Sequence, residues 1–187
     1  MGFPGGTVDI PGPPHPELAA VVETALLDPY GHGERLAAAL RGEVPVAAGH
    51  LATNAWVFGG DGGQLLLVRH RVLGWVNPGG HLDLGELPVA GAARELVEET
   101  GVRPTAAAAR PGLVRAAVFP EGPSGPAHWH WNIHHLFVAD PAAPLSAEPG
   151  SPAAWFPVDA LPDDRVDDLD ELLALLAPLV PSGERLQ

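Results

Sequence analysis

The sequence RELVEETG, residues 94–101, places three glutamates close together in what reads as a helix. Their spacings of three and four residues put Glu95, Glu98 and Glu99 on one helix face, where like charges repel each other. The opposite arc of the same helix carries small and apolar side chains, namely Val89, Ala92, Ala93, Leu96, Val97 and Thr100. We therefore expect a helix whose apolar arc packs against a sheet and whose acidic stripe faces a cavity or solvent.

The acidic stripe has two interpretations, a solvated helix face or a cation site. Solvated faces usually place a basic residue four positions from a glutamate. Here the carboxylates surround Gly91, although glycine costs about 1 kcal/mol relative to alanine inside a helix. Gly91 would leave room for a ligand or another backbone, and Arg94 would hold one carboxylate in place. Oxygen ligands without a thiolate suit Mg²⁺ or Mn²⁺, which would offset the repulsion and polarise a phosphoryl oxygen or activate water.

Composition limits the functions open to the chain. Its 187 residues suffice for one domain with an extension, and its net charge is −13 with no lysine. This charge disfavours nonspecific binding to nucleic acid or an anionic membrane, because both need a basic surface. The absence of cysteine excludes disulfides, thiolate metal sites and a cysteine nucleophile. With no secretory signal and no long apolar run in the sequence, the cytoplasm is the expected location.

The remaining patterns predict strands mixed with flanking helices, which is typical of an α/β sandwich. Residues 1–15 are rich in proline and glycine and are expected to be a loose arm. The elements that follow are predicted as helices at 16–28 and 33–42, strands at 50–60 and 65–71, a glycine-rich loop at 74–86, a helix at 88–100, strands at 112–119 and 129–140, a short strand or turn at 153–161, and a helix at 166–180.

The stretch GHLDLGELPVAGAARELVEETGV, residues 80–102, resembles the complete Nudix box, Gx5Ex7REUxEExGU with U aliphatic. The resemblance implies a mixed sheet between helices and a divalent metal, Mg²⁺ or Mn²⁺. In that family the glutamates matching Glu95, Glu98 and Glu99 bind metal, the arginine matching Arg94 orients a glutamate, and the residue matching Glu86 supports the loop or the metal shell. Either Glu98 or Glu99 would then be the base that accepts a proton from water, and Gly80 and Gly101 would shape the loop and end the helix.

The order of elements is similar to that family over about residues 47–182. We therefore expect a Nudix domain at residues 47–187, preceded by an arm and helical extension at residues 1–46.

Candidate substrate contacts lie before the box and on a later strand. The loop residues Gly79, Gly80 and His81 belong to the sequence PGGHLD at 78–83, and Arg69 precedes it on a predicted strand. On the strand at 129–140, alternation puts His128, His130, Asn132 and His134 on one face, and Trp129, Trp131, Ile133, His135 and Phe137 on the other. A histidine on a strand is more often structural than a ligand. The alternative is that His81, Asp83 and His130 form a second polar cluster that adds a metal ligand or contacts a substrate phosphate.

The resemblance implies hydrolysis of a diphosphate bond in a nucleoside diphosphate linked to another group, or in a related small diphosphate. The alternative is a Nudix-like nucleotide-binding or regulatory domain without turnover. An enzyme like isopentenyl diphosphate isomerase is expected to use a cysteine, which this chain lacks. The expected partner is a small-molecule diphosphate, with neither nucleic acid nor membrane bound, and a homodimer is expected because many members of the family dimerise.

Overall fold

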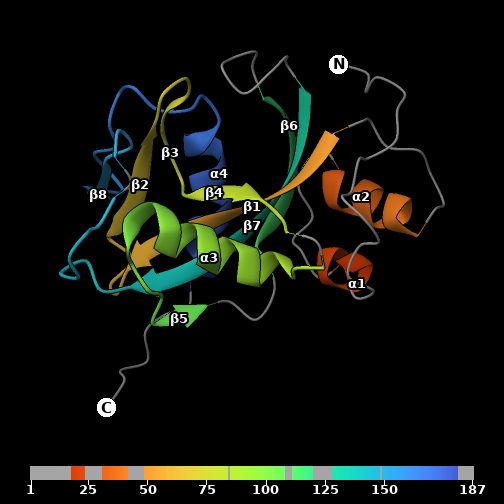
Figure 1. Ribbon diagram of the computed structural model, residues 1–187, viewed down its shortest axis with the longest axis horizontal. Helices are drawn as coiled ribbons and strands as arrows, with labels where there is room; N and C mark the ends of the chain where they lie inside the picture. Colours follow the sequence, from red (N-terminus) through yellow and green to blue (C-terminus); the bar gives the residue numbers. More distant parts are fainter. Residues whose placement is uncertain are drawn as a thin grey trace.

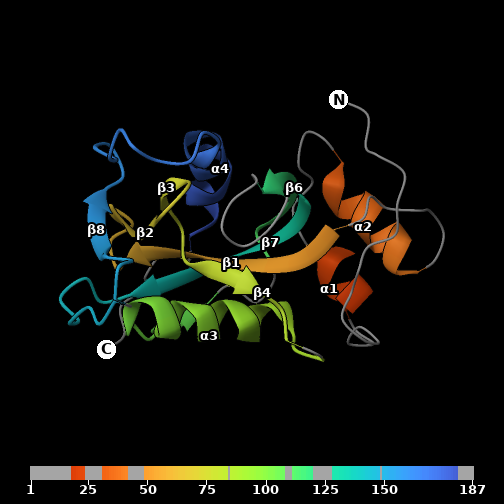
Figure 2. The ribbon, with the colours of Figure 1, turned by 45° about the horizontal axis from the view of Figure 1, so that its top comes forward.

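A mixed β-sheet lies between helices packed on its two faces (Figures 1 and 2). The computed structural model describes residues 18–23, 31–41, 49–83, 85–107, 111–119, 128–147 and 149–180. Within these ranges the sheet has eight strands in the order β3-β2-β1-β7-β5, while β4 pairs with β1, β6 with β7 and β8 with β2. The predicted α/β sandwich with a mixed sheet is therefore confirmed.

Two long neighbouring strands, β1 and β7, form the centre of the sheet. They run parallel, and each has antiparallel neighbours on its other side. The strands are β1 (Gly49–Gly59), β2 (Gln64–His70), β3 (Gly74–Val76), β4 (Gly79–His81), β5 (Ala106–Ala107), β6 (Leu113–Phe119), β7 (His128–Ala139) and β8 (Ala153–Pro157). The predicted strand pair at 50–60 and 65–71 is thus confirmed as β1 and β2, and the later strand predictions as β6, β7 and β8.

The segment predicted as a glycine-rich loop at 74–86 contains two short strands, so that prediction was wrong in part. The backbone of β3 pairs with β2, and β4 pairs with β1 by setting Gly79, Gly80 and His81 opposite Asn54, Thr53 and Ala52. The sequence did not predict β4 as a strand, because Gly79 and Gly80 carry no side chains that could alternate between two faces. The strand forms because its backbone pairs with that of β1.

Helix α3 (Pro88–Thr100) carries the acidic stripe and packs along one face of the sheet. Ala92 and Leu96 are fully buried against the residues Ala55, Val57, Leu66 and Phe137. Val89 and Ala93 are partly buried at the edge of the same cluster. Pro88 begins the helix, and Gly101 ends it in a left-handed conformation with φ 73°. Both boundaries agree with the prediction, and Val89, Ala92, Ala93 and Leu96 of the predicted apolar arc pack against the sheet.

Helix α4 (Leu169–Leu176) covers the opposite face of the sheet (Figure 2). Leu172 and Leu176 pack there with Trp56 and Phe58 of β1. The helix predicted at 166–180 is shorter than expected, because the segment that contains Pro178 continues as the 3₁₀ helix η1 (Ala177–Leu179). Proline lacks the N–H that would extend an α-helix.

Helices α1 (Leu18–Glu23) and α2 (His32–Leu40) pack where β1 and β7 begin (Figure 1). Leu36 is fully buried in one cluster with Trp131 and Ile133, so these helices share a core with the sheet. The predicted arm at 1–15, and residues 24–28 of the first predicted helix, lie outside the described residues. The predicted domain boundary at residue 46 stays a prediction, because the helices before it and the sheet after it share one hydrophobic core.

None of the helices in the described ranges has the length and hydropathy that a membrane crossing requires.

We predict that Gly101→Ala lowers the free energy of unfolding by about 1–2 kcal/mol. The positive φ strains any L side chain, and an added Cβ would lie 2.8 Å from Ser146 Cβ. Urea denaturation measures the change. Gly60→Ala is the control, because Gly60 lies in the β1–β2 turn with open space around it. Equal stability of the two variants would contradict the account of this helix end.

Candidate active site

The guanidinium of Arg94 lies at the centre of the acidic cluster. Its Nε and Nη2 atoms donate to the two carboxylate oxygens of Glu86, at 3.1 and 2.9 Å. Nη1 donates to Glu95 Oε1 at 2.8 Å and to Glu98 Oε2 at 3.2 Å, and Nη2 also reaches the carbonyl oxygen of His81 at 3.1 Å. Arg94 was expected to orient one carboxylate, and in the structure it holds three.

Glu86 joins the loop before α3 to the helix. Besides its two-pronged pairing with Arg94, its Oε2 accepts the backbone N–H of Asp83 at 3.0 Å. The hydrogen bond from Arg94, helped by that N–H, holds the pKa of Glu86 below its ordinary value against the opposing effect of burial. Glu86 is therefore held ionised in a fixed orientation between the loop and the helix.

Glu95 lies beneath β4, and its side chain is 16% exposed, compared with 54% for Glu98. A Cβ placed on Gly80 would collide with its carboxylate, so the strand approaches the helix this closely only because residue 80 is glycine. Burial raises the pKa of Glu95, while its bond from Arg94 acts in the opposite direction. A nearby cation would therefore favour the ionised form of this carboxyl group.

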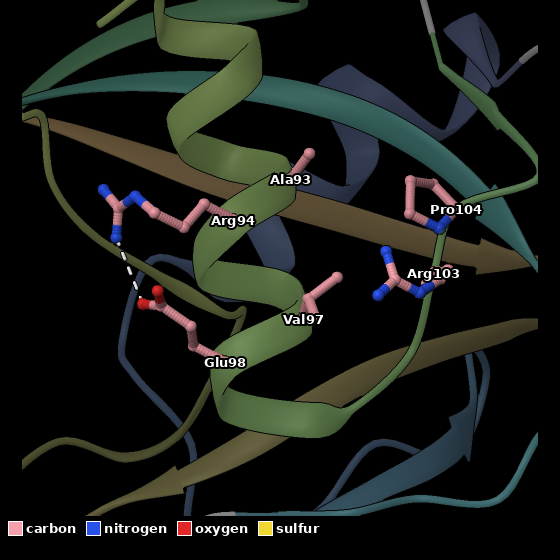
Figure 3. A pocket seen from close by; sticks show the side chains of 6 residues that line it. All are labelled: Ala93, Arg94, Val97, Glu98, Arg103 and Pro104. Atoms are coloured by element: carbon pink, nitrogen blue, oxygen red, sulfur yellow. Dashed lines mark hydrogen bonds and ion pairs between the residues drawn. The ribbon is translucent and has the colours of Figure 1, made fainter.

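The other two glutamates of the stripe have different surroundings. The side chain of Glu98 is 54% exposed. It bonds to Arg94, and Figure 3 shows this contact. Glu99 Oε2 accepts the backbone N–H of Gly79 at 3.0 Å, which fastens the other end of β4 to the helix.

The space beside Gly91, predicted to admit a ligand or another backbone, is taken by the side chains of Leu82, Glu86 and Thr53.

The carboxylates have the donor chemistry of a site for a hard divalent cation. They offer only oxygen atoms, as Mg²⁺ and Mn²⁺ prefer, and the half-buried Glu95 would gain from a cation. The described residues include no group of three or more histidines and carboxylates already arranged to hold a metal ion. In this structure Glu95 Oε1 and Glu98 Oε2 accept hydrogen bonds from Arg94. The carboxylates of the stripe are therefore gathered around a guanidinium.

His81 and His130, predicted in one cluster, do lie together, on the face of the sheet opposite α3. Their ring centroids are 5.0 Å apart, and both rings also lie near His50, which the sequence reasoning missed. Only the parallel register that sets His50 beside His130 reveals it. The third predicted member, Asp83, contacts instead the Nε of Arg94 at 3.7 Å, and its side chain is 75% exposed.

The predicted polar face of β7 is only partly polar. His134 is buried, and its Nδ1 accepts the Trp56 indole N–H at 2.9 Å. Burial lowers the pKa of His134 to about 3, so it is a neutral structural residue. His135, on the apolar face, is buried with a pKa lowered to about 4 by the same cause. The side chain of His128 lies outside the described residues.

Arg69, a predicted substrate contact, lies on β2 beside Trp75 of β3. Its Nη2 forms an ion pair with Asp164 Oδ2 at 2.6 Å. Strand alternation places it on the same face as Leu65 and Leu67, which is the face covered by α4. The predicted site residues are therefore divided between the two faces, with the box glutamates on the α3 side.

A shallow hollow lies on the outer side of α3 (Figure 3). It is lined by Ala93, Arg94, Val97, Glu98, Arg103 and Pro104. Arg94 and Glu98 form its charged edge, and Arg103 lies beyond Val97 on the opposite edge. The hollow therefore borders the acidic cluster without enclosing Glu95 or Glu99.

Comparisons with known proteins match most of the chain to one family. The family model of the NUDIX domain matches residues 49–176. A putative mutator protein, MutT4, of Mycobacterium tuberculosis is 34% identical over 135 residues, which cover 63% of this chain and 52% of that protein. A CMP-5'-(N-acetyl-N-hydroxy-3-aminopropyl)phosphonate hydrolase of Streptomyces rubellomurinus is 32% identical over 135 residues, which cover 66% of this chain and 61% of that protein.

A solved structure shows the same fold. It is a NUDIX-family hydrolase from Clostridium perfringens with a TM-score of 0.54 and 18% sequence identity, and the match covers 70% of this chain and 97% of that chain. In contrast, the chain spans only about half to three fifths of the length of the two curated relatives.

We predict that Arg94→Lys lowers the free energy of unfolding by about 1–3 kcal/mol, because lysine cannot replace a two-pronged bond to Glu86 while reaching Glu95 and Glu98. Arg103→Lys, on the other edge of the same hollow, is the matched control and should change stability by less than about 0.5 kcal/mol. Chemical denaturation of both variants tests this. Similar losses would show that Arg94 does not hold the cluster together.

A second prediction concerns acid stability. Because the pKa of Glu86 is lower in the folded than in the unfolded chain, its contribution is present above its ordinary pKa and is lost as the pH falls through the folded value. As the pH is lowered below the ordinary titration range of a glutamate, about pH 4–5, wild type should therefore lose stability more steeply than Glu86→Gln. Denaturation at several pH values measures the slopes. The raised pKa of Glu95 changes the pH dependence of stability in the opposite direction, but it does so in both proteins. Parallel curves of stability against pH for the two proteins would therefore rule out the role given to Glu86.

Proposed function

This chain belongs to the Nudix hydrolase family, and we propose that it hydrolyses a diphosphate bond in a nucleotide derivative with the help of Mg²⁺ or Mn²⁺. The observation that carries the proposal is the cluster in which one guanidinium, that of Arg94, holds Glu86, Glu95 and Glu98 together. This cluster concentrates carboxylate oxygens at the point where the loop meets the helix. An ordinary solvated helix face has no need of an arginine that holds three carboxylates together.

The four box glutamates have distinct proposed roles. Glu95, Glu98 and Glu99 would hold the divalent metal, with Glu86 supporting the loop and the metal shell. Nudix hydrolases generally use divalent metals, and such an ion would neutralise charge on the diphosphate and lower the pKa of an attacking water. Arg94 positions the carboxylates, and Glu98 or Glu99 accepts the proton released by the water. Glu98 is the more exposed to solvent, while Glu99 is bound to the N–H of Gly79.

The proposed substrate is a small nucleotide-linked diphosphate. Gly79 and Gly80 form the strand that lies against Glu99 and Glu95, so we propose that the diphosphate passes along it. His81, His130 and Arg69 are the proposed further contacts. The Streptomyces relative is named for a CMP-linked phosphonate and the mycobacterial relative as a mutator protein. The Streptomyces name favours a nucleotide derivative for this chain as well, and a nucleotide–phosphonate compound belongs in any substrate panel.

A nucleotide-binding or regulatory domain without turnover is the competing proposal. Proteins of that kind usually carry a damaged box, whereas every fixed position is present here. A homodimer, a cytoplasmic location and the absence of nucleic-acid binding also remain proposals.

We predict that Glu98→Gln and Glu99→Gln each lower kcat with Mg²⁺ by about 10²–10⁴-fold, because each removes a metal ligand or the base. The measurement is product release from a panel of nucleoside diphosphate derivatives, dinucleotides, nucleoside triphosphates and a CMP-linked phosphonate. A chelator should abolish turnover by the wild type.

Glu34→Gln provides the matched control, since Glu34 is an exposed glutamate of α2 outside the box. It should retain wild-type kcat. Wild-type turnover by both box variants would sink the catalytic assignment, and no turnover on any compound by a folded, metal-loaded wild type would favour the regulatory alternative.

A further inference from the structure

Three imidazole rings gather on the face of the sheet opposite α3. His50 belongs to β1, His81 to β4 and His130 to β7. The ring centroids are 5.0 Å apart for His50 and His81, 5.0 Å for His81 and His130, and 6.0 Å for His50 and His130. The planes of each pair meet at 68° to 77°. We call these three side chains the imidazole cluster.

The backbone register fixes this cluster. His50 is opposite His130 in the parallel pair, and His81 is opposite Ala52, two residues after His50 and therefore on the same face of β1. The intervening odd-numbered positions face α3, because Thr53 Oγ1 donates to the carbonyl of Pro88 at the start of that helix. The imidazole cluster thus results from strand pairing and not from the positions of mobile loops.

The imidazoles are suited to an oxyanion. A neutral imidazole donates one N–H and a protonated one donates two, so three rings present several donors to a tetrahedral anion. The shared chemistry of the ligand is therefore that of a phosphoryl or phosphonyl group.

The arginines that could otherwise bind phosphate on this part of the molecule face carboxylates. Arg115 pairs with Glu171 and Arg165 with Asp170, and Arg94 is taken up by the box glutamates. Arg69 could contact the substrate only by giving up its ion pair with Asp164. In a chain with a net charge of −13 and no lysine, an anionic substrate needs local donors. The imidazole cluster supplies them.

Strand β4 connects the imidazole cluster to the carboxylates. The N–H of Gly79 binds Glu99, Gly80 touches Glu95, and His81 follows directly with its side chain on the other face. Among the described strands β4 pairs only with β1, so a ligand can pass around its outer edge. A substrate whose scissile diphosphate lies at the carboxylates would then place another phosphoryl group at the imidazoles.

We propose that His50, His81 and His130 bind a non-reacting phosphoryl or phosphonyl group of the substrate, on the opposite face of β4 from the carboxylates that perform the reaction. This inference rests on the proposed function. It assigns the enzyme to substrates with a phosphoryl group beyond the bond that is cut.

The first test measures binding of inorganic phosphate to the full-length protein in a chelator, by calorimetry or ³¹P NMR. His50→Asn, His81→Asn and His130→Asn should each weaken binding about 10-fold. His70→Asn is the matched control on β2 and should stay within about twofold of wild type. His81 is exposed, so its variant should fold even if the others do not. Absence of phosphate binding by wild type, or unchanged binding by His81→Asn, would overturn the proposal.

The second test separates a substrate contact from a site for free phosphate. For two substrates that differ by one terminal phosphoryl group, His81→Asn should raise KM about 10-fold more for the longer substrate than for the shorter one. An equal effect on both substrates would refute the substrate role. Glu98→Gln should bind inorganic phosphate as well as wild type does. If the wild-type protein binds phosphate but turns over no substrate, the result contradicts the proposed reaction and leaves the proposed role of the imidazole cluster standing.

Discussion

The structure around the box depends on one guanidinium among like charges. Without Arg94, Glu86, Glu95 and Glu98 would repel one another at close range, and Glu95 is also partly withdrawn from water. Paired with Arg94, the same groups fix the angle between the loop and α3, because Glu86 belongs to that loop and the carbonyl of His81 to the end of β4. The position of β4 follows from this contact, and so does the separation of carboxylates from imidazoles.

A second constraint is the approach of backbone to helix at β4. Gly80 permits the contact with Glu95, and the N–H of Gly79 bonds to Glu99. The strand contributes no side chain to the α3 face at these two positions. Polar backbone groups of the strand can therefore lie beside the acidic stripe, while its one side chain, that of His81, contributes to the other face.

The sequence predicted the features that local signals determine. Helix α3 was placed correctly because Pro88, Gly101 and the 3.6-residue periodicity are all contained in one stretch. Strand β4 was missed because only pairing with β1 makes it a strand. His134 was assigned to a polar face because alternation gives two faces without saying which one a distant helix covers. His50 was missed for a related reason, since the register that brings it to His130 joins residues 80 positions apart.

That same parallel register has a consequence for how the molecule assembles. Antiparallel neighbours such as β1 and β2 meet through a short turn, but β1 and β7 can pair only after the whole intervening chain, α3 included, has been looped out. Contacts of such high sequence separation slow folding. The acidic helix is a local element and can form early, whereas the three histidines are scattered until the centre of the sheet closes. A nascent or partly unfolded chain would thus carry the carboxylates without the imidazoles, and the two halves of the proposed site would exist together only in the complete fold.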